Sequence, residues 1–312
     1  MFEEVGSGDS MAVSADLGSL SLTDERPVAE EGAEVEQVAD DDDSSLFDEP
    51  PPQPDCDICM QPLPIRASIQ PYMNCCGKTL CFGCSKKHET TILRTNEKRI
   101  EKAKKEQLPP PPLLKELCPF CRMELPEAGE KGEQQALDRT QKRVELGDPD
   151  AMLQLSFYYR DGDYGLSADV KKFLELAHQA ASLGSVDAHC CLGNIYRLGN
   201  CGVSPNIETA LAHFGAAAKG GHVPSRHNLG KFDYDNGNKK TAVRHWRISA
   251  AAGCQPSVDE LIQCFQEGHL SKKTLEESIR AKHEACEAIR SEDRDLALEM
   301  MIQKGQDVES YY

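Results

Sequence analysis

The stretch MNCCGKTLCFGC, residues 73–84, holds four of the fourteen cysteines in this 312-residue chain. Two further pairs flank it, CDIC at 56–59 and CPFC at 118–121, so that eight cysteines lie between residues 56 and 121. A closed structural zinc site takes four ligands, and eight thiolates are therefore enough for two ions. Because the chain starts without the basic and apolar segments of a secretory signal, paired cysteines indicate metal binding rather than disulfides. We expect two structural zinc ions in this region.

The cluster resembles a RING finger over roughly residues 54–126, through the segments CDIC, CCGKTLCFGC and CPFCR. In that family the ligand pairs interleave, so that the first and third pairs hold one zinc ion and the second and fourth pairs hold the other. The resemblance implies a small α+β cross-brace with one zinc ion on Cys56, Cys59, Cys81 and Cys84. The second zinc ion is then bound by Cys75, Cys76, Cys118 and Cys121.

Lys78 stands where the family usually places a ligand histidine. A protonated lysine has no acceptor lone pair and cannot bind zinc. The sequence CCGKTLC is similar to all-cysteine RING variants if Cys75 and Cys76 are both ligands, and Gly77 can then adopt the backbone angles that a tight turn needs. The alternative is His88 as the missing ligand, with one of the two adjacent cysteines spare.

A RING finger binds a ubiquitin-conjugating enzyme that carries ubiquitin as a thioester, and it holds the two in a reactive arrangement. The resemblance therefore implies a ubiquitin-protein ligase that activates a partner enzyme and forms no covalent intermediate of its own. By the same resemblance, Ile58, Pro119 and Phe120 contact the conjugating enzyme, and Arg122 bridges to ubiquitin as the catalytic candidate. A guanidinium suits that task because it donates several hydrogen bonds while staying charged.

Two departures from the family pattern favour a different class of function. Lys78 replaces the ligand histidine, and no aromatic residue is evident at the place between the third and fourth ligand pairs where several active RING fingers carry one. The alternative hypothesis is a non-catalytic scaffold in which the RING fold is a structural zinc module that binds other proteins.

An insert of thirty-three residues separates Cys84 from Cys118, which is long for a compact RING finger. Residues 85–108 contain neither glycine nor proline and predict a helix, which the four prolines at 109–112 end. The chain then has to return to Cys118 in an extended, polyproline-like conformation.

The second half of the chain contains an internal repeat. Three positions recur in step, and their residues are Gly147, Gly184, Gly221 and Gly253; Ala151, Ala188, Ser225 and Ser257; and Leu155, Leu192, Leu229 and Leu261. The glycines are spaced by 37, 37 and 32 residues. In the first block, Asp148 can cap a helix that has Pro149 at its first position.

Each block predicts two helices, and LGNIYRLGNCGVSPNIETALAHFGAAAKGG resembles a Sel-like repeat, a relative of the tetratricopeptide family. Residues 146–290 are expected to form an all-α solenoid with a capping helix, preceded by a linker or first helix at 127–145 and followed by a C-terminal tail at 291–312. Such arrays bind other proteins, and in a ligase this part would recruit the substrate or an adaptor. His178, His213 and His245 are interpreted as packing or capping residues, and the six cysteines outside the cluster are interpreted as core residues.

The first 53 residues are interpreted as a disordered acidic tail. Residues 1–50 contain sixteen acidic residues and one basic residue, so they carry 15 of the 17 net negative charges. An acidic chain is a poor partner for phosphates, and no nucleic-acid partner is expected. No apolar run is long enough to span a membrane, and we expect an intracellular protein of the cytoplasm or nucleus.

Overall fold

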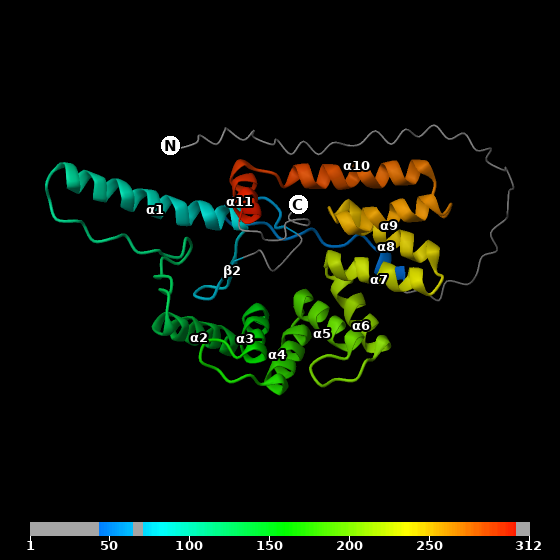
Figure 1. Ribbon diagram of the computed structural model, residues 1–312. Helices are drawn as coiled ribbons and strands as arrows, with labels where there is room; N and C mark the ends of the chain where they lie inside the picture. Colours follow the sequence, from blue (N-terminus) through cyan, green and yellow to red (C-terminus); the bar gives the residue numbers. More distant parts are fainter. Residues whose placement is uncertain (1–43, 65–70, 304–312) are drawn as a thin grey trace, which may run out of the picture. The chain divides into compact units, whose positions relative to one another are not determined.

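The computed structural model describes residues 44–64 and 71–303. In this part of the chain, two short strands and a single-turn helix, η1 (Ser44–Phe47), accompany eleven α-helices (Figure 1). The strands β1 (Tyr72–Met73) and β2 (Lys78–Thr79) pair in antiparallel register, with Tyr72 opposite Thr79. None of the described helices is both long and apolar enough to cross a lipid bilayer.

The helix predicted in the insert is confirmed as α1 (Phe82–Lys105), which Figure 1 shows as one long ribbon. It begins three residues earlier than expected because the Cys81 side chain caps it, accepting a hydrogen bond from the amide of Cys84. After the helix ends, the proline-rich return segment is fixed to its middle. Asn96 accepts from the Leu114 amide at 2.7 Å and donates to the Leu114 carbonyl at 3.2 Å.

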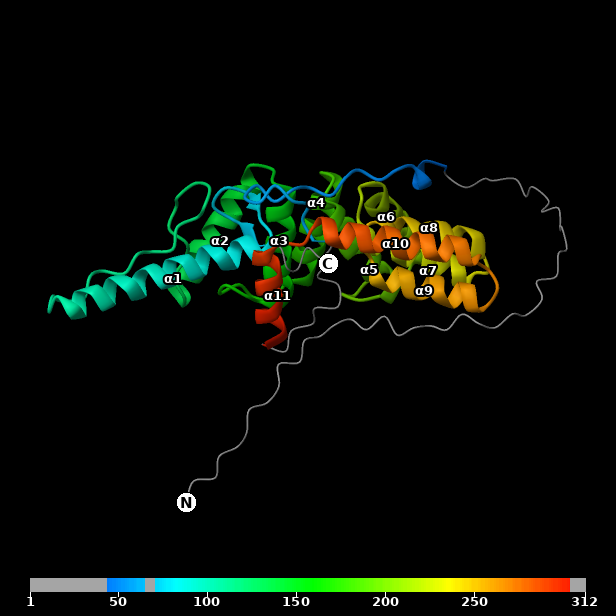
Figure 2. The same ribbon diagram turned by 90° about the horizontal axis from the view of Figure 1, so that it is seen from above.

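The repeat region consists of helix pairs that follow one another along the chain, as the colour order in Figures 1 and 2 shows. Each helix packs against the next one in sequence. The region begins with α2 (Glu130–Glu145), which is the first-helix alternative predicted for residues 127–145. The helix pairs are α3 (Pro149–Asp161) with α4 (Val170–Ser182), α5 (Val186–Leu198) with α6 (Ile207–Lys219), α7 (Val223–Asp235) with α8 (Lys239–Ala251), and α9 (Gln255–Gln266) with α10 (Lys272–Ala288).

The recurring positions of the sequence are the buried positions of these helices. The four small residues of the repeat and the four leucines are all buried. The four glycines all have positive φ, between 77° and 103°, which lets the chain turn from one helix pair into the next. Small residues also make room for aromatic ones, since a Cβ added to Gly193 would lie 2.6 Å from the Phe214 ring and one on Gly230 would lie 2.5 Å from Trp246.

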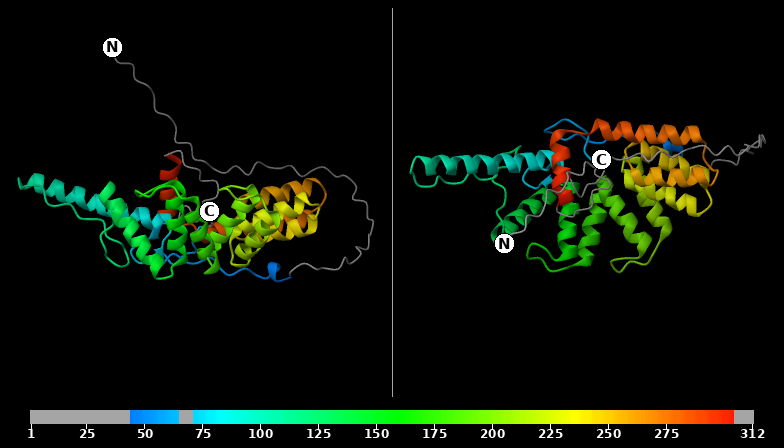
Figure 3. Two further views of the ribbon diagram at one scale, coloured as in Figure 1. Left: turned by 90° about the horizontal axis from the view of Figure 1, so that it is seen from below. Right: turned by 45° about the horizontal axis from the view of Figure 1, so that its top comes forward.

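The ends of the described chain differ from the expectation of two tails. Residues 292–303 form a helix, α11 (Glu292–Gln303), which packs against α1, as Figures 1 and 3 show. Residues 44–53 lie against the repeat helices, because Leu46 and Phe47 find apolar and aromatic neighbours there. The rest of the acidic tail and residues 304–312 lie outside the described residues.

His178 and His213 meet in one cluster with His189 and Tyr196, in which His178 is exposed and the other three residues are half-buried. His189 Nδ1 lies 2.9 Å from His213 Nδ1, and the Tyr196 ring stacks on the His213 ring. The Tyr196 hydroxyl lies 3.2 Å from His178 Nε2. Burial, together with the neighbouring histidines, lowers the pKa of His213 to about 4, and burial lowers that of His189.

This cluster predicts that acid destabilises the repeat region. His213 stays neutral in the folded protein down to about pH 4, whereas the unfolded chain binds a proton near its ordinary pKa of 6.5. Its contribution to stability is complete above pH 6.5 and is lost as the pH falls towards 4. Thermal melting followed by circular dichroism should show that His213→Gln loses less melting temperature between pH 7 and pH 5 than the wild type. The exposed His283→Gln is the matched control, and equal slopes in all three proteins would contradict the prediction.

Candidate metal centres

The structure brings the eight clustered cysteines together in two groups of four. In each group the four sulfur atoms lie within 4.8 Å of one another. The first group is Cys56, Cys59, Cys81 and Cys84, and the second is Cys75, Cys76, Cys118 and Cys121. These are the two sets expected from the sequence, while the bound metal itself stays a prediction.

Two CxxC loops, one in each group, have the same backbone geometry. In the loop at Cys56, the Cys56 amide donates to the carbonyl five residues later, the Met60 amide donates back to Cys56, and Met60 has a φ of 55°. In the loop at Cys118, the Cys118 amide likewise donates five residues ahead, and Arg122 bonds back to Cys118 with a φ of 61°. Each loop is closed by an isolated strand bridge, Asp55 to Pro62 or Leu117 to Glu124. The loops are therefore equivalent turns that present two sulfur atoms to one side.

The second pair of thiols in each group comes from the chain around the small sheet. Cys75 and Cys76 lie in the turn between β1 and β2, where the amides of Cys76 and Gly77 both donate to the Met73 carbonyl. Gly77 has a φ of 73°, as the expected tight turn requires. Cys81 and Cys84 lie at the start of α1 and are buried with Leu80.

The sulfur atoms of the first group already accept hydrogen bonds. The Cys81 amide donates to Cys56 Sγ at 3.3 Å, and the Cys84 amide donates to Cys81 Sγ at 3.4 Å. The hydrogen bond from the Cys81 side chain lowers the pKa of Cys56 to about 4, whereas burial raises the pKa of Cys84 to about 12. Thiolates this close repel one another, so four of them need a cation in their midst.

The donor set fits zinc, which prefers four thiolates in a closed tetrahedral site. The cysteines of each group would hold one ion. Bound there, zinc would fix the loops and would leave no coordination place for a substrate, because all four ligands come from the protein.

Neither Lys78 nor His88 belongs to a sulfur group. Lys78 Nζ forms an exposed ion pair with Asp57 at 2.9 Å. His88 Nε2 lies 2.7 Å from the Leu117 carbonyl, so this nitrogen carries the proton and donates. The structure therefore does not place His88 as the alternative fourth ligand, and it gives both adjacent cysteines a place in the second group.

The residues expected to contact a conjugating enzyme differ in exposure. Ile58 is 43% exposed, and Arg122 is exposed on the loop that follows Cys118. Pro119 and Phe120 are half-buried, and Phe120 packs against the apolar residues of the first group. Part of the Phe120 side chain is thus used inside the module.

Arg294 of α11 is a residue of the site that the sequence does not reveal. Its side chain is fully buried, and Nη2 donates to Cys59 Sγ at 3.5 Å and to the Gln61 carbonyl at 3.3 Å. Gly83 permits this approach, since a Cβ there would lie 2.9 Å from the Arg294 amide nitrogen. A zinc ion with four thiolates has a net negative charge, which a buried guanidinium offsets.

A second contact joins the cysteine module to the start of the repeats. The Tyr72 hydroxyl of β1 donates to Asp148 Oδ2 at 2.7 Å, and Arg143 Nε donates to the same oxygen at 2.9 Å. Asp148 Oδ1 caps α3 as predicted, accepting from the amides of Asp150 and Ala151. Although burial alone would raise it, the hydrogen bonds from Tyr72 and Arg143 hold the pKa of Asp148 below its usual value. One carboxylate thus serves both the helix cap and the junction.

Comparison with known proteins gives structural similarity only. The chain is similar to the crystal structure of a Sel1 repeat protein from Oxalobacter formigenes, with 22% identity and a TM-score of 0.42, over 49% of this chain and 64% of the other. It is also similar to c5321, a protective antigen of uropathogenic Escherichia coli with an SLR fold, with 22% identity and a TM-score of 0.42, over 56% of this chain and 38% of the other. No family model and no curated protein matches the chain.

Arg294 predicts a difference between the two metal centres. Replacing it with alanine removes a hydrogen bond and a positive charge from the first group, and should weaken zinc binding there by about 10- to 100-fold, the usual effect of losing a residue that hydrogen-bonds to a metal ligand. The full chain, loaded with zinc, is titrated with a chromogenic chelator while the ions released per chain are counted.

One ion should leave the Arg294→Ala protein at lower chelator concentration, and the other should leave as in the wild type. The exposed Arg280→Ala serves as the matched control. Release of both ions together, or no change in either, would show that Arg294 does not support the first group.

Proposed function

We propose that this protein is a protein-interaction scaffold in which a two-zinc cysteine module is fixed to a helical repeat array. The observation that supports this best is the pair of contacts that join the module to other parts of the chain. Tyr72 meets Asp148 at the first repeat helix pair, and Arg294 meets Cys59 from the helix that follows the repeats. Both contacts are polar and at least partly buried, and such contacts specify one orientation.

A fixed orientation suits a scaffold because two binding surfaces held at one geometry lose little freedom when both are occupied. The zinc ions of this proposal are structural. They would hold the loops that carry Ile58 and Arg122, and the repeats would bind a second protein.

A second candidate is the RING-type ubiquitin ligase. The interleaved sulfur groups and the exposed Ile58 and Arg122 favour it. In this case Ile58, with Pro119 and Phe120, contacts a ubiquitin-conjugating enzyme, and Arg122 contacts ubiquitin. The repeats would then recruit the substrate or an adaptor. The Lys78–Asp57 ion pair lies one residue from Ile58 and would be part of the surface that the conjugating enzyme has to meet.

Thioester discharge separates the two candidates. Conjugating enzymes preloaded with ubiquitin are mixed with free lysine and the zinc-loaded full chain, and the loss of thioester is followed. For a scaffold we expect no acceleration with any enzyme of a broad panel, while native mass spectrometry still finds two zinc ions per chain.

Acceleration that is lost in both Ile58→Ala and Arg122→Ala, and kept in the exposed Lys131→Ala control, would overturn the scaffold proposal in favour of the ligase. The two variants should also differ in kind. Ile58→Ala would abolish binding of the conjugating enzyme, whereas Arg122→Ala would keep binding and lose discharge, because its partner is ubiquitin.

A further inference from the structure

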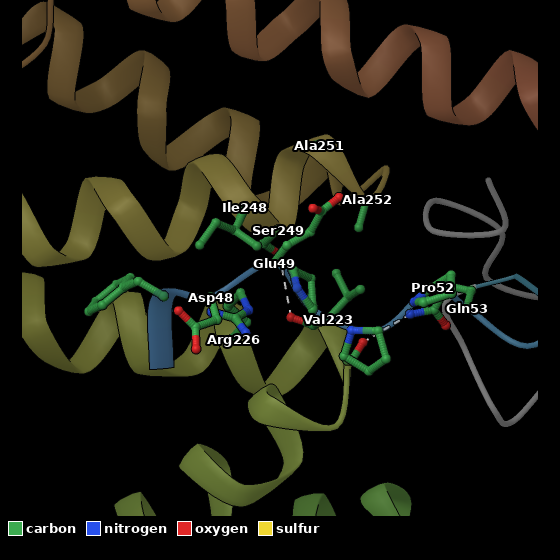
Figure 4. Close-up of a pocket in the computed structure, with 14 residues that line it drawn as sticks. Asp48, Glu49, Pro52, Gln53, Val223, Arg226, Ile248, Ser249, Ala251 and Ala252 are labelled. Atoms are coloured by element: carbon green, nitrogen blue, oxygen red, sulfur yellow. Dashed lines mark hydrogen bonds between the residues drawn. The ribbon is translucent and has the colours of Figure 1, made fainter. Parts of the chain in front are cut away.

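Residues 44–53 lie across the face of the repeat array that α7 and α8 form, as Figure 4 shows. The segment begins with η1 and continues through three prolines to Gln53. Near its start, Arg226 Nη1 donates to the Leu46 carbonyl at 2.7 Å, and at its end Gln53 Nε2 donates to the Gly221 carbonyl at 2.9 Å. The array therefore holds a short, mostly irregular peptide by hydrogen bonds near both of its ends.

Leu46 and Phe47 are the apolar anchors of this segment. Leu46 packs against a buried cluster of α6 and α7, whose members are Ala210, Phe214, Ala218 and Leu229. The Phe47 ring centroid lies 4.6 Å from that of the buried His245, and the Arg244 guanidinium carbon lies 3.7 Å from the Phe47 centroid. The groove thus recognises an aliphatic side chain, an aromatic side chain and a backbone carbonyl in succession.

The groove carries arginines and the segment carries acidic residues, with no ion pair between them among the described residues. Arg226 is buried, and its two hydrogen bonds go to the neutral carbonyls of Leu46 and Ala218, at 2.7 Å each. Among the described residues no carboxylate forms an ion pair with it, and the exposed Arg244 adds a further positive charge. The two residues that follow Phe47 are the exposed Asp48 and Glu49. An acidic peptide therefore suits this face.

The segment leaves part of the groove unfilled. A cavity of about 420 Å³ lies between the prolines of the segment and the side chains of Val223, Ile248 and Ala252. A peptide with larger apolar side chains after its acidic residues can fill this space and bury more surface than the resident segment does.

From these contacts we infer that the α7–α8 groove is a recognition site for an extended peptide of another protein, carrying Leu-Phe followed directly by acidic residues, and that residues 44–53 occupy it as an internal competitor. The inference deepens the proposed scaffold function, on which it rests, by naming the chemistry of the partner bound by the repeats. The competitor is tethered close to the groove and acts at an effective concentration in the millimolar range. A partner peptide therefore has to bind the groove more tightly than residues 44–53 do, or be present at a higher concentration than their effective concentration.

The test opens the groove in the full chain by the double substitution Leu46→Ala and Phe47→Ala. A fluorescent peptide with the sequence of residues 44–53 is titrated with each protein, and its anisotropy is measured. The opened protein should bind the peptide about 10- to 100-fold more tightly than the wild type, because the tethered competitor is gone. Adding Arg244→Ala to the opened protein should weaken binding, and the exposed Lys240→Ala should not.

Three outcomes would overturn the inference. No binding by the opened protein, with its helical content intact by circular dichroism, would make residues 44–53 a structural strap. Equal binding by the wild type would remove the internal competitor. A concentration-dependent dimer of the wild type that the opened protein does not form would assign the groove to a second copy of the chain. The thioester discharge assay tests the scaffold proposal separately. Failure of the peptide-groove inference can therefore be distinguished from failure of the scaffold proposal.

Discussion

The close approach of four sulfur atoms is the constraint on which the cysteine module depends. Residues as far apart in sequence as Cys75 and Cys121 come together, while few apolar side chains besides Leu63 and Leu80 are buried around them. A module with so small a core would draw its folding energy from a bound metal. Amide donors and the buried Arg294 would offset part of the charge of the four thiolates around such an ion, and they already order the loops that carry the sulfur atoms.

The same constraint explains why the cysteine module does not form an independent domain. Its loops have too little surface to bury alone, and they use polar groups of the helices that follow the module in sequence. Asp148 caps α3 with one oxygen and receives Tyr72 and Arg143 with the other, so the junction is as well defined as the helix start. Helix α11, which follows the repeats, makes the second set of contacts through Arg294, and Lys87 and Asp293 add an exposed ion pair at 2.7 Å.

Features with a period or a fixed spacing could be predicted from the sequence, and single long-range contacts could not. The insert helix and the buried repeat positions follow from local spacing, and the division of the eight cysteines into two sets is what the resemblance to a RING finger implies. Arg294 lies 235 residues from Cys59, in a stretch interpreted as a tail, and nothing in its neighbours indicates a sulfur partner. The contacts of Leu46 and Phe47 could not be predicted for a different reason. Two apolar residues in an acidic segment indicate no binding site until the groove that accepts them is known.

The resident segment and the first sulfur group are also linked through the chain itself. Only Pro54 and Asp55 separate Gln53 from Cys56, and the three steps between these two residues span at most about 11 Å. The Leu63 amide donates to the Pro54 carbonyl, and Asp55 bridges to Pro62, so this connection is part of the first CxxC loop. In the proposed scaffold, a partner that displaces residues 44–53 would release the chain directly before Cys56. This short connection would then be the physical route between the α7–α8 groove and the loop that carries Ile58.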